Sequence, residues 1–151
     1  MKTLQSSKSV IIDADARTLW EVLTKADYTK AYMFNCEVNT DWEVGSQITW
    51  KGNFQGYDAF QKGEVLAFEP FDSLSYSTFD PNFGLEDKAE NYIHVGYALK
   101  ELDEKVELTV SNKTFDGDEK RMAHVEQGWA MVIPQIKEVA ERIMRKADET
   151  E

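Results

Sequence analysis

The feature that most constrains this fold is a change in hydrophobic period near residue 118. Beyond it, apolar residues recur at the spacing of an amphipathic helix, which we expect at residues 119–146. The apolar stripe consists of Met122, Val125, Trp129, Val132, Ile133, Ile136, Val139, Ala140 and Ile143. Asp118 can cap this helix, and Pro134 removes one of its backbone hydrogen bonds, which predicts a kink. A stripe of this length has to be buried against another element.

Before that helix, short segments of alternating apolar and polar residues are separated by turn residues. They cover residues 9–12, 36–40, 46–51, 60–68, 74–79, 92–99 and 106–114. Helical patterns follow only the first segment: one starts after Asp13 or Asp15, and a shorter one covers residues 27–33. Strands without helices between them favour an antiparallel sheet. We therefore predict a single α+β domain over residues 1–151, with a curved sheet of six to seven strands around the C-terminal helix.

Alternation along each strand indicates which side chains face the helix. We expect the space between sheet and helix to be lined by Ile48, Trp50, Tyr76, Thr78, Tyr97, Leu108, Val110, Asn112, Trp129 and Ile133. A mostly apolar lining with few polar groups is typical of a small-molecule pocket. The alternative is that these side chains fill a core. Trp129 lies centrally on the stripe, so we expect it to be buried, and Gly128 either lets the helix approach the sheet closely or bends it.

Asn112 is the most informative polar residue of this lining. A buried amide without a partner costs about 1–3 kcal/mol, so its side chain has to be paired. It either bonds a polar group of a ligand or bonds backbone or water near the strand end. Tyr76 and Tyr97 carry the same ambiguity, because a phenol can donate to a ligand or to a neighbouring carbonyl.

Charge and cysteine content exclude several classes of function. The chain has 28 acidic and 17 basic residues, a net charge of −11, and so lacks the basic surface that nucleic-acid binding needs. A single cysteine, Cys36, excludes an intrachain disulfide and any cysteine-rich metal site. No apolar run approaches the ~20 residues of a membrane span, and the N-terminus does not resemble a signal peptide. We expect a cytoplasmic protein that does not insert into membranes.

The remaining polar motifs do not indicate a catalytic site, a metal site or a cofactor. His94 has the opposite parity to its inward neighbours, and His124 lies one residue off the helical stripe, so both are expected at the surface. Neither has a second ligand at metal-binding spacing. Residues 116–119 lack the later ligands of a calcium loop and are explained by a turn and a helix cap. The acidic residues 86–87 are expected in a solvated loop.

Five stretches of the sequence form a set of local motifs: residues 14–20 (ADARTLW); 41–46 (DWEVGS) with 50–52 (WKG); 63–65 (GEV) with 69–70 (EP) and 74–76 (LSY); 90–92 (ENY) with 95–99 (VGYAL); and 128–129 (GW). Together they resemble the family named for the activator of heat-shock-protein ATPase, a branch of the START/Bet v-like helix-grip superfamily (SRPBCC). The resemblance runs from about Lys8 to Arg145. It implies a helix-grip fold over nearly the whole chain.

The resemblance also implies functions, because relatives in the superfamily bind lipids, steroids or polyketides between sheet and helix. Our leading interpretation is non-catalytic binding of a small hydrophobic or aromatic ligand in that cavity. One alternative is an enzyme of the polyketide cyclase or hydratase type, in which Tyr76, Tyr97 or Asn112 orients the substrate. Another is a chaperone-interacting module, although we do not expect the additional N-terminal domain that co-chaperones of the family carry.

Overall fold

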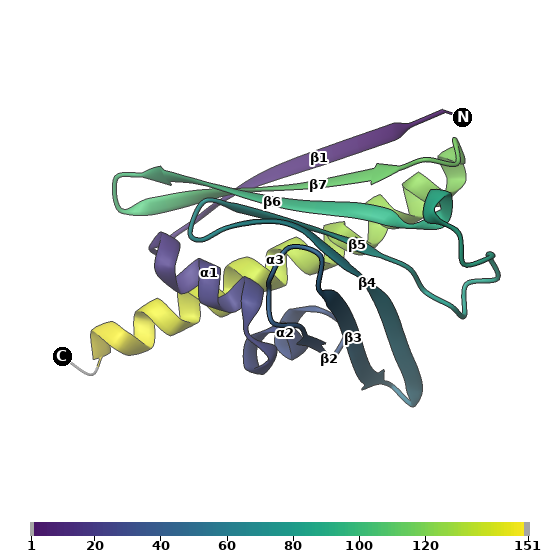
Figure 1. Ribbon diagram of the computed structural model, residues 1–151. Coiled ribbons are helices and arrows are strands. Elements are labelled where there is room, and N and C mark those ends of the chain that lie inside the picture. Colours follow the sequence, from purple (N-terminus) through teal and green to yellow (C-terminus); the bar gives the residue numbers. More distant parts are fainter. Residues whose placement is uncertain (1, 150–151) are drawn as a thin grey trace.

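The computed structural model of the protein describes residues 2–149. Within them, seven strands form one antiparallel sheet and three α-helices lie on one side of it (Figure 1). The elements in chain order are β1 (Leu4–Ile12), α1 (Ala16–Thr24), α2 (Ala26–Tyr32), β2 (Cys36–Asn39), β3 (Gln47–Phe54), β4 (Tyr57–Glu69), β5 (Ser73–Thr78), a 3₁₀ turn η1 (Ala89–Asn91), β6 (Ile93–Leu102), β7 (Lys105–Thr114) and α3 (Glu119–Glu149). The predicted α+β helix-grip architecture is confirmed.

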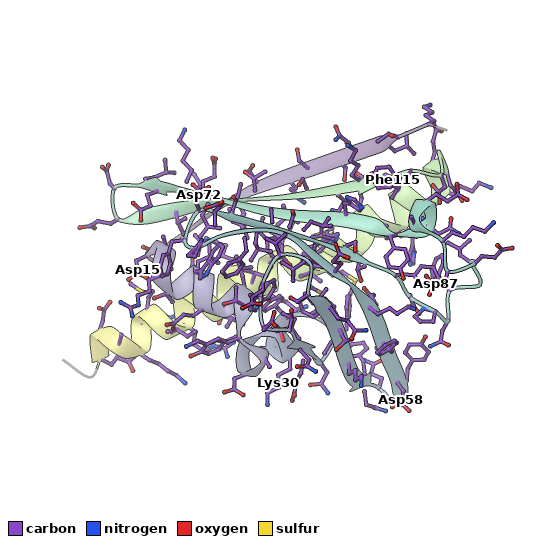
Figure 2. All side chains as sticks on the ribbon, viewed as in Figure 1. Asp15, Lys30, Asp58, Asp72, Asp87 and Phe115 are labelled. Carbon is purple, nitrogen blue, oxygen red and sulfur yellow. The ribbon has the colours of Figure 1, made fainter. Side chains whose placement is uncertain are left out.

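The sheet has the order β1-β7-β6-β5-β4-β3-β2, so β1 and β2 form its two edges. Strands β2 to β7 are neighbours in the sheet in the same order as in the sequence. The first strand, β1, pairs with the last, β7, along the whole length of β1. Figure 1 shows the sheet curving so that α3 runs along its inner face, with α1 and α2 close to the C-terminal part of that helix. Charged side chains such as Lys30, Asp58 and Asp72 lie at the periphery (Figure 2).

The bend of the sheet is located in β4, which belongs to both of its halves. Up to Glu64 this strand pairs with β3, and from Val65 onward it pairs with β5. An irregularity between Val65 and Ala67 shifts the register, which is how a β-bulge changes strand direction. At Gly63 a Cβ atom would lie 1.7 Å from the Ser77 carbonyl oxygen, so only glycine allows this close approach. The bend in β4 divides the sheet into one part in which β4 pairs with β3 and another in which it pairs with β5.

The two main helices begin at the predicted caps. The Asp15 carboxylate accepts a hydrogen bond from the Thr18 backbone N–H at 2.7 Å at the start of α1. The Asp118 carboxylate accepts from the backbone N–H groups of Lys120 and Arg121 at 3.0 and 3.1 Å at the start of α3. α3 continues through Pro134 to Glu149, three residues beyond the predicted end.

One core cluster lies between the sheet and the helices, and part of it is formed where α1 packs on the C-terminal half of α3. Leu19 and Leu23 of α1 and Ile136 and Ala140 of α3 are all fully buried there. Together with the inward residues of β1, β6 and β7 they exclude water from this end. The opposite end, against the first half of α3, is packed less completely.

Candidate functional site

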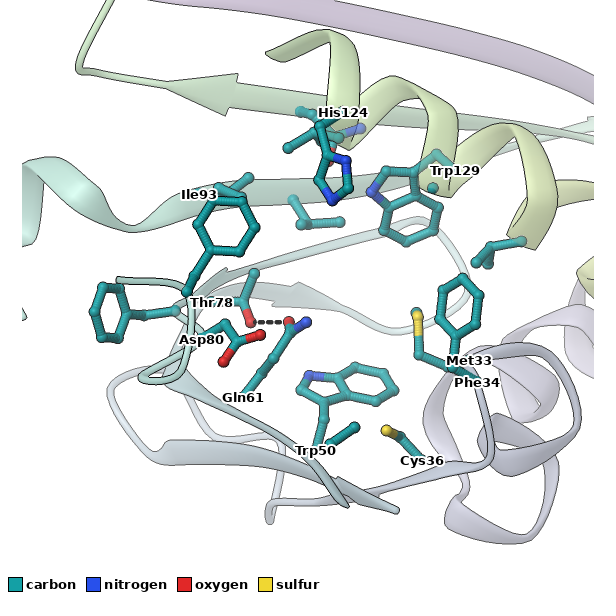
Figure 3. Close-up of a pocket in the computed structure, with 18 of the residues that line it drawn as sticks. Met33, Phe34, Cys36, Trp50, Gln61, Thr78, Asp80, Ile93, His124 and Trp129 are labelled. Atoms are coloured by element: carbon teal, nitrogen blue, oxygen red, sulfur yellow. Dashed lines mark hydrogen bonds between the residues drawn. The ribbon is translucent and has the colours of Figure 1, made fainter. Parts of the chain in front are cut away.

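A cavity of about 260 Å³ lies between the sheet and the N-terminal half of α3 (Figure 3). Its walls come from β2 to β7, from α3, from the segment after α2 and from the loop between β5 and β6. This volume is just below the range of about 300–1,000 Å³ of typical ligand pockets. A cavity of this size suits a molecule of one to three rings.

Half of the predicted lining residues are at this cavity. Trp50, Tyr76, Thr78, Asn112 and Trp129 line it, from β3, β5, β7 and α3. In Figure 3 the indole rings of Trp50 and Trp129 lie on opposite sides of the hollow. Strand parity therefore identified side chains on the correct face. That any of them binds a ligand is a proposal, developed below.

The other predicted lining residues do not reach this cavity. Ile48, Tyr97, Leu108, Val110 and Ile133 are buried but absent from its walls. Val110 and Ile133 instead line a separate depression beside β1. The physical reason is that parity gives the face of a strand but not the position along it, and the packed end of the grip holds Ile48 and Leu108. These five residues do not line this cavity, and their contact with a ligand stays a prediction.

Aromatic rings run continuously across the sheet from one side of the cavity to the other. The ring centroids of Trp50 and Tyr76 are 5.6 Å apart, those of Tyr76 and Tyr97 are 6.1 Å apart, and those of Tyr97 and Trp129 are 5.9 Å apart. The Tyr76 and Tyr97 hydroxyl groups lie 3.4 Å from each other. Tyr97 thus supports the cavity from behind its wall, and the two phenols are partners of each other.

Two polar atoms at the cavity have no hydrogen-bond partner among the described residues. They are the Trp50 Nε1 donor and the Asn112 Oδ1 acceptor, on side chains whose residues are each only 3% exposed. The predicted pairing of Asn112 with backbone is not observed within residues 2–149. Buried polar groups are almost always hydrogen-bonded in native proteins, and each exception calls for an explanation. Both residues line this cavity, and Asn112 also lines two neighbouring depressions.

The mouth of the cavity contains residues that the sequence analysis did not select. Gln61, Phe83 and His124 are exposed and line it, and Asp80 is half-buried beside them (Figure 3). The Thr78 hydroxyl donates to Gln61 Oε1 at 2.6 Å, and the rings of Phe83 and His124 are 5.7 Å apart. His124 is at the surface as predicted, but it also forms part of the mouth. The Phe83–His124 contact could have been suspected only from the presence of a large apolar residue, Phe83, in a loop.

Arg121 fastens the loop between β5 and β6 to the start of α3. Its guanidinium is nearly buried and donates to Asp116 Oδ2 at 2.7 Å and to the Asn91 carbonyl oxygen at 2.7 Å. The positive charge is therefore matched by a carboxylate outside the cavity. Although Arg121 contributes to the lining, it offers no unpaired cation to a ligand.

This ion pair predicts a loss of stability in acid. Burial acts to raise the pKa of Asp116, but hydrogen bonds from the Asp118 backbone and from Arg121 outweigh it, and the net pKa is lowered from 3.8. A carboxylate with a lowered folded-state pKa stabilises the fold at any pH above its unfolded-state pKa. This stabilisation is lost as the pH falls through the folded-state pKa. Asp116→Asn should cost about 2 kcal/mol of unfolding free energy at pH 7.

Urea denaturation at pH 7 and near pH 3 would measure this effect. The difference in unfolding free energy between the parent and Asp116→Asn should be smaller at the lower pH, because the Asp116 carboxylate of the parent is then partly protonated. Asp103→Asn, in the exposed turn between β6 and β7, is the matched control and should behave as the parent. An equal difference at both pH values would contradict the role of the Asp116 charge.

Two buried phenols and a thiol near the cavity have raised pKa values. Burial raises the pKa of the Tyr76 and Tyr97 phenols and of the Cys36 thiol. His94 lies on the outer face, as predicted from parity, with its ring 4.7 Å from that of Phe115. Burial and the neighbouring Lys113 lower the pKa of His94.

Within residues 2–149, no three His, Cys, Asp or Glu side chains are grouped to hold a metal ion. None of the helices described is long and apolar enough to cross a membrane.

A curved antiparallel sheet that grips a long C-terminal helix around a mostly apolar hollow defines the START-like, helix-grip class of proteins. Within this class, residues 13–141 match the family described as Activator of Hsp90 ATPase homolog 1-like protein. The chain belongs to that family, as the resemblance of its motifs implied.

Solved structures of similar proteins support this assignment. ChR145 from Cytophaga hutchinsonii is 33% identical with a TM-score of 0.78, over 96% of this chain and 99% of that chain. The Aha1 dimer from Colwellia psychrerythraea is 17% identical with a TM-score of 0.71, over 91% and 96% of the two chains. CalU16 from Micromonospora echinospora is 18% identical with a TM-score of 0.67, over 99% and 93%. The last two likenesses concern the fold alone. Comparison with curated protein sequences gives no match.

Proposed function

We propose that the protein binds a small, largely aromatic molecule in the cavity between the sheet and α3, without transforming it. The observation that carries the proposal is the cavity itself. It is walled by aromatic and aliphatic side chains, among them Trp50, Tyr76 and Trp129, and its exposed polar groups gather at the mouth. Such a concave apolar site with few polar groups is the usual form of a small-molecule site.

Binding is favoured over catalysis by the protonation states of the buried groups. A general base has to be deprotonated near the working pH, and a nucleophilic thiol has to ionise. Burial pushes the pKa of Tyr76, Tyr97 and Cys36 in the opposite direction. These residues are therefore suited to packing and orienting a ligand rather than to proton transfer.

A chaperone-binding surface has less support than the cavity. Such a surface needs a contiguous exposed apolar patch. Among the large exposed apolar side chains, Phe54 and Tyr57 are neighbours across the β3–β4 hairpin, and the others come from separate segments: Ile11, Val44, Phe71, Phe83 and Met131. Chaperone contact, like a cytoplasmic location, stays a prediction from the sequence and the family resemblance.

Titration with N-phenylnaphthylamine, a neutral hydrophobic fluorophore, would test the proposal. We expect saturable fluorescence and quenching of Trp50 and Trp129, with Trp20 and Trp42 less affected because they pack against Phe68 at the other end. Excess probe should also raise the melting temperature, by an amount equivalent to about 2.7 kcal/mol at 100 times Kd. Native mass spectrometry of freshly purified protein would show any ligand carried from the cell. Absence of both saturable binding and thermal stabilisation would refute the proposal.

A further inference from the structure

We propose that the ligand of this cavity is an uncharged molecule with two hydrogen-bonding groups: an acceptor bound by Trp50 and a donor bound by Asn112. The inference rests on the proposed function and specifies the chemistry of its ligand. It comes from the two buried polar atoms that lack partners, Trp50 Nε1 and Asn112 Oδ1. A ligand that satisfies both recovers the hydrogen bonds that the protein leaves unmade.

The chemistry of each atom fixes what it can bind. An indole Nε1–H is only a donor, so the group facing Trp50 has to be an acceptor such as a carbonyl, ether or hydroxyl oxygen. The Asn112 Oδ1 atom accepts, so its partner has to carry an O–H or N–H. Neighbouring side chains do not supply these groups. The Tyr76 hydroxyl is partnered by Tyr97, and the Thr78 hydroxyl donates to Gln61.

The positions of the two residues require separate polar groups on the ligand. Trp50 is on β3 and Asn112 is on β7, and β4, β5 and β6 lie between these strands in the sheet. Curvature brings both side chains to one cavity, but from different walls. The ring of Tyr76 packs beside Trp50, and Trp129 lies across the hollow from it. A flat aromatic body with polar groups at separate positions matches this arrangement.

The charges around the cavity favour a neutral ligand. Arg121 is neutralised by Asp116 and also donates to the Asn91 carbonyl oxygen, so it leaves no free cation for a carboxylate or phosphate. Asp80, the carboxylate of the lining, is at the mouth and accepts a hydrogen bond from the Asn82 backbone N–H at 2.8 Å. A charged ligand group deep in the cavity would be desolvated without a counter-charge.

Diphenylmethane and three of its derivatives form a matched set of probes. Diphenylmethane has neither polar group, benzophenone adds an acceptor, para-benzylphenol adds a hydroxyl donor, and para-benzoylbenzoate adds a carboxylate to the ketone. Affinities would be measured by calorimetry for the parent protein, Trp50→Phe and Asn112→Leu. Phe removes the indole donor and Leu replaces the amide with an apolar group of similar size. Diphenylmethane corrects for any change in packing, and thermal denaturation confirms that both variants are folded.

The expected result is a crossed pattern. Relative to diphenylmethane, benzophenone should lose about fivefold in affinity in Trp50→Phe and nothing in Asn112→Leu. Conversely, para-benzylphenol should lose about fivefold in Asn112→Leu. The carboxylate probe should bind the parent at least tenfold more weakly than benzophenone. Asn112→Leu should melt at the same or a higher temperature without ligand, because an unpaired buried acceptor has been removed.

Two outcomes would overturn the inference in distinguishable ways. If all four probes bind the parent equally, or the variants weaken every probe alike, the polar atoms are satisfied by water and do not select the ligand. The cavity would then still be a hydrophobic binding site. If no probe binds saturably, the proposed function fails and the inference fails with it.

Discussion

Gly128→Phe is expected to weaken probe binding strongly while leaving the protein folded. Gly128 lines the cavity from α3, and a Cβ atom built on it would meet no other atom within 4 Å. The expectation that this glycine allows close packing of helix and sheet is therefore wrong, since the space beside it is open. A phenyl ring there would occupy the hollow, and accommodating a ligand beside it at an overpacking cost of about 1–3 kcal/mol predicts a loss of about 5- to 150-fold in affinity.

The matched control is Gly128→Ala, measured with the same N-phenylnaphthylamine titration. A methyl group in open space leaves most of the cavity free, so its affinity should equal that of the parent. Its free energy of unfolding should rise by about 1 kcal/mol, because alanine has the higher helix propensity. A Gly128→Phe protein that binds the probe as tightly as the parent would show that the probe binds elsewhere.

Ile136→Ala is expected to destabilise the protein more than Trp129→Ala, although tryptophan is the larger residue. Ile136 is fully buried between α3 and the packed end of the sheet, and truncation of such a residue costs about 2–5 kcal/mol. Trp129 was expected to be buried at the centre of the stripe. It is only partly buried and faces the cavity, so its removal enlarges an existing space. We expect a cost of about 1–2 kcal/mol for Trp129→Ala.

Urea denaturation of both variants would measure the difference in unfolding free energy. The slope of that free energy against urea concentration should match the parent's if unfolding remains two-state. Trp129→Ala should in addition weaken N-phenylnaphthylamine binding, whereas Ile136→Ala should leave it close to the parent value in the folded protein. If Trp129→Ala proved to be the more destabilising change, the first half of α3 would be part of the closed core.

The strand pattern predicted the fold and one face of the site because both depend on local alternation. Trp50, Tyr76 and Asn112 line the cavity as their parity indicated. The position of the hollow along the grip was not predictable in this way. It depends on the bend of β4 near Gly63 and on the partner that each half of that strand takes, which are properties of the assembled sheet.

The mouth of the cavity was missed for a related reason. Phe83 and Asp80 are in a loop without regular periodicity. This loop is held in place by a hydrogen bond from Arg121 to the Asn91 carbonyl oxygen, and the two residues are thirty positions apart in the sequence. Such a contact leaves no pattern in the neighbouring residues. The two unpartnered polar atoms likewise became visible only when the side chains were placed together.

The division of the grip into a packed end and a hollow end has a consequence for how such a protein can diversify. Some residues of the core cluster, such as Leu19 and Ile136, do not line the hollow, whereas Asn112 and the partly buried Trp129 do. Substitutions at the hollow end can therefore alter which molecule is accepted without first endangering the fold. Proteins of this fold can therefore change ligand through successive single substitutions, each of which leaves the protein folded.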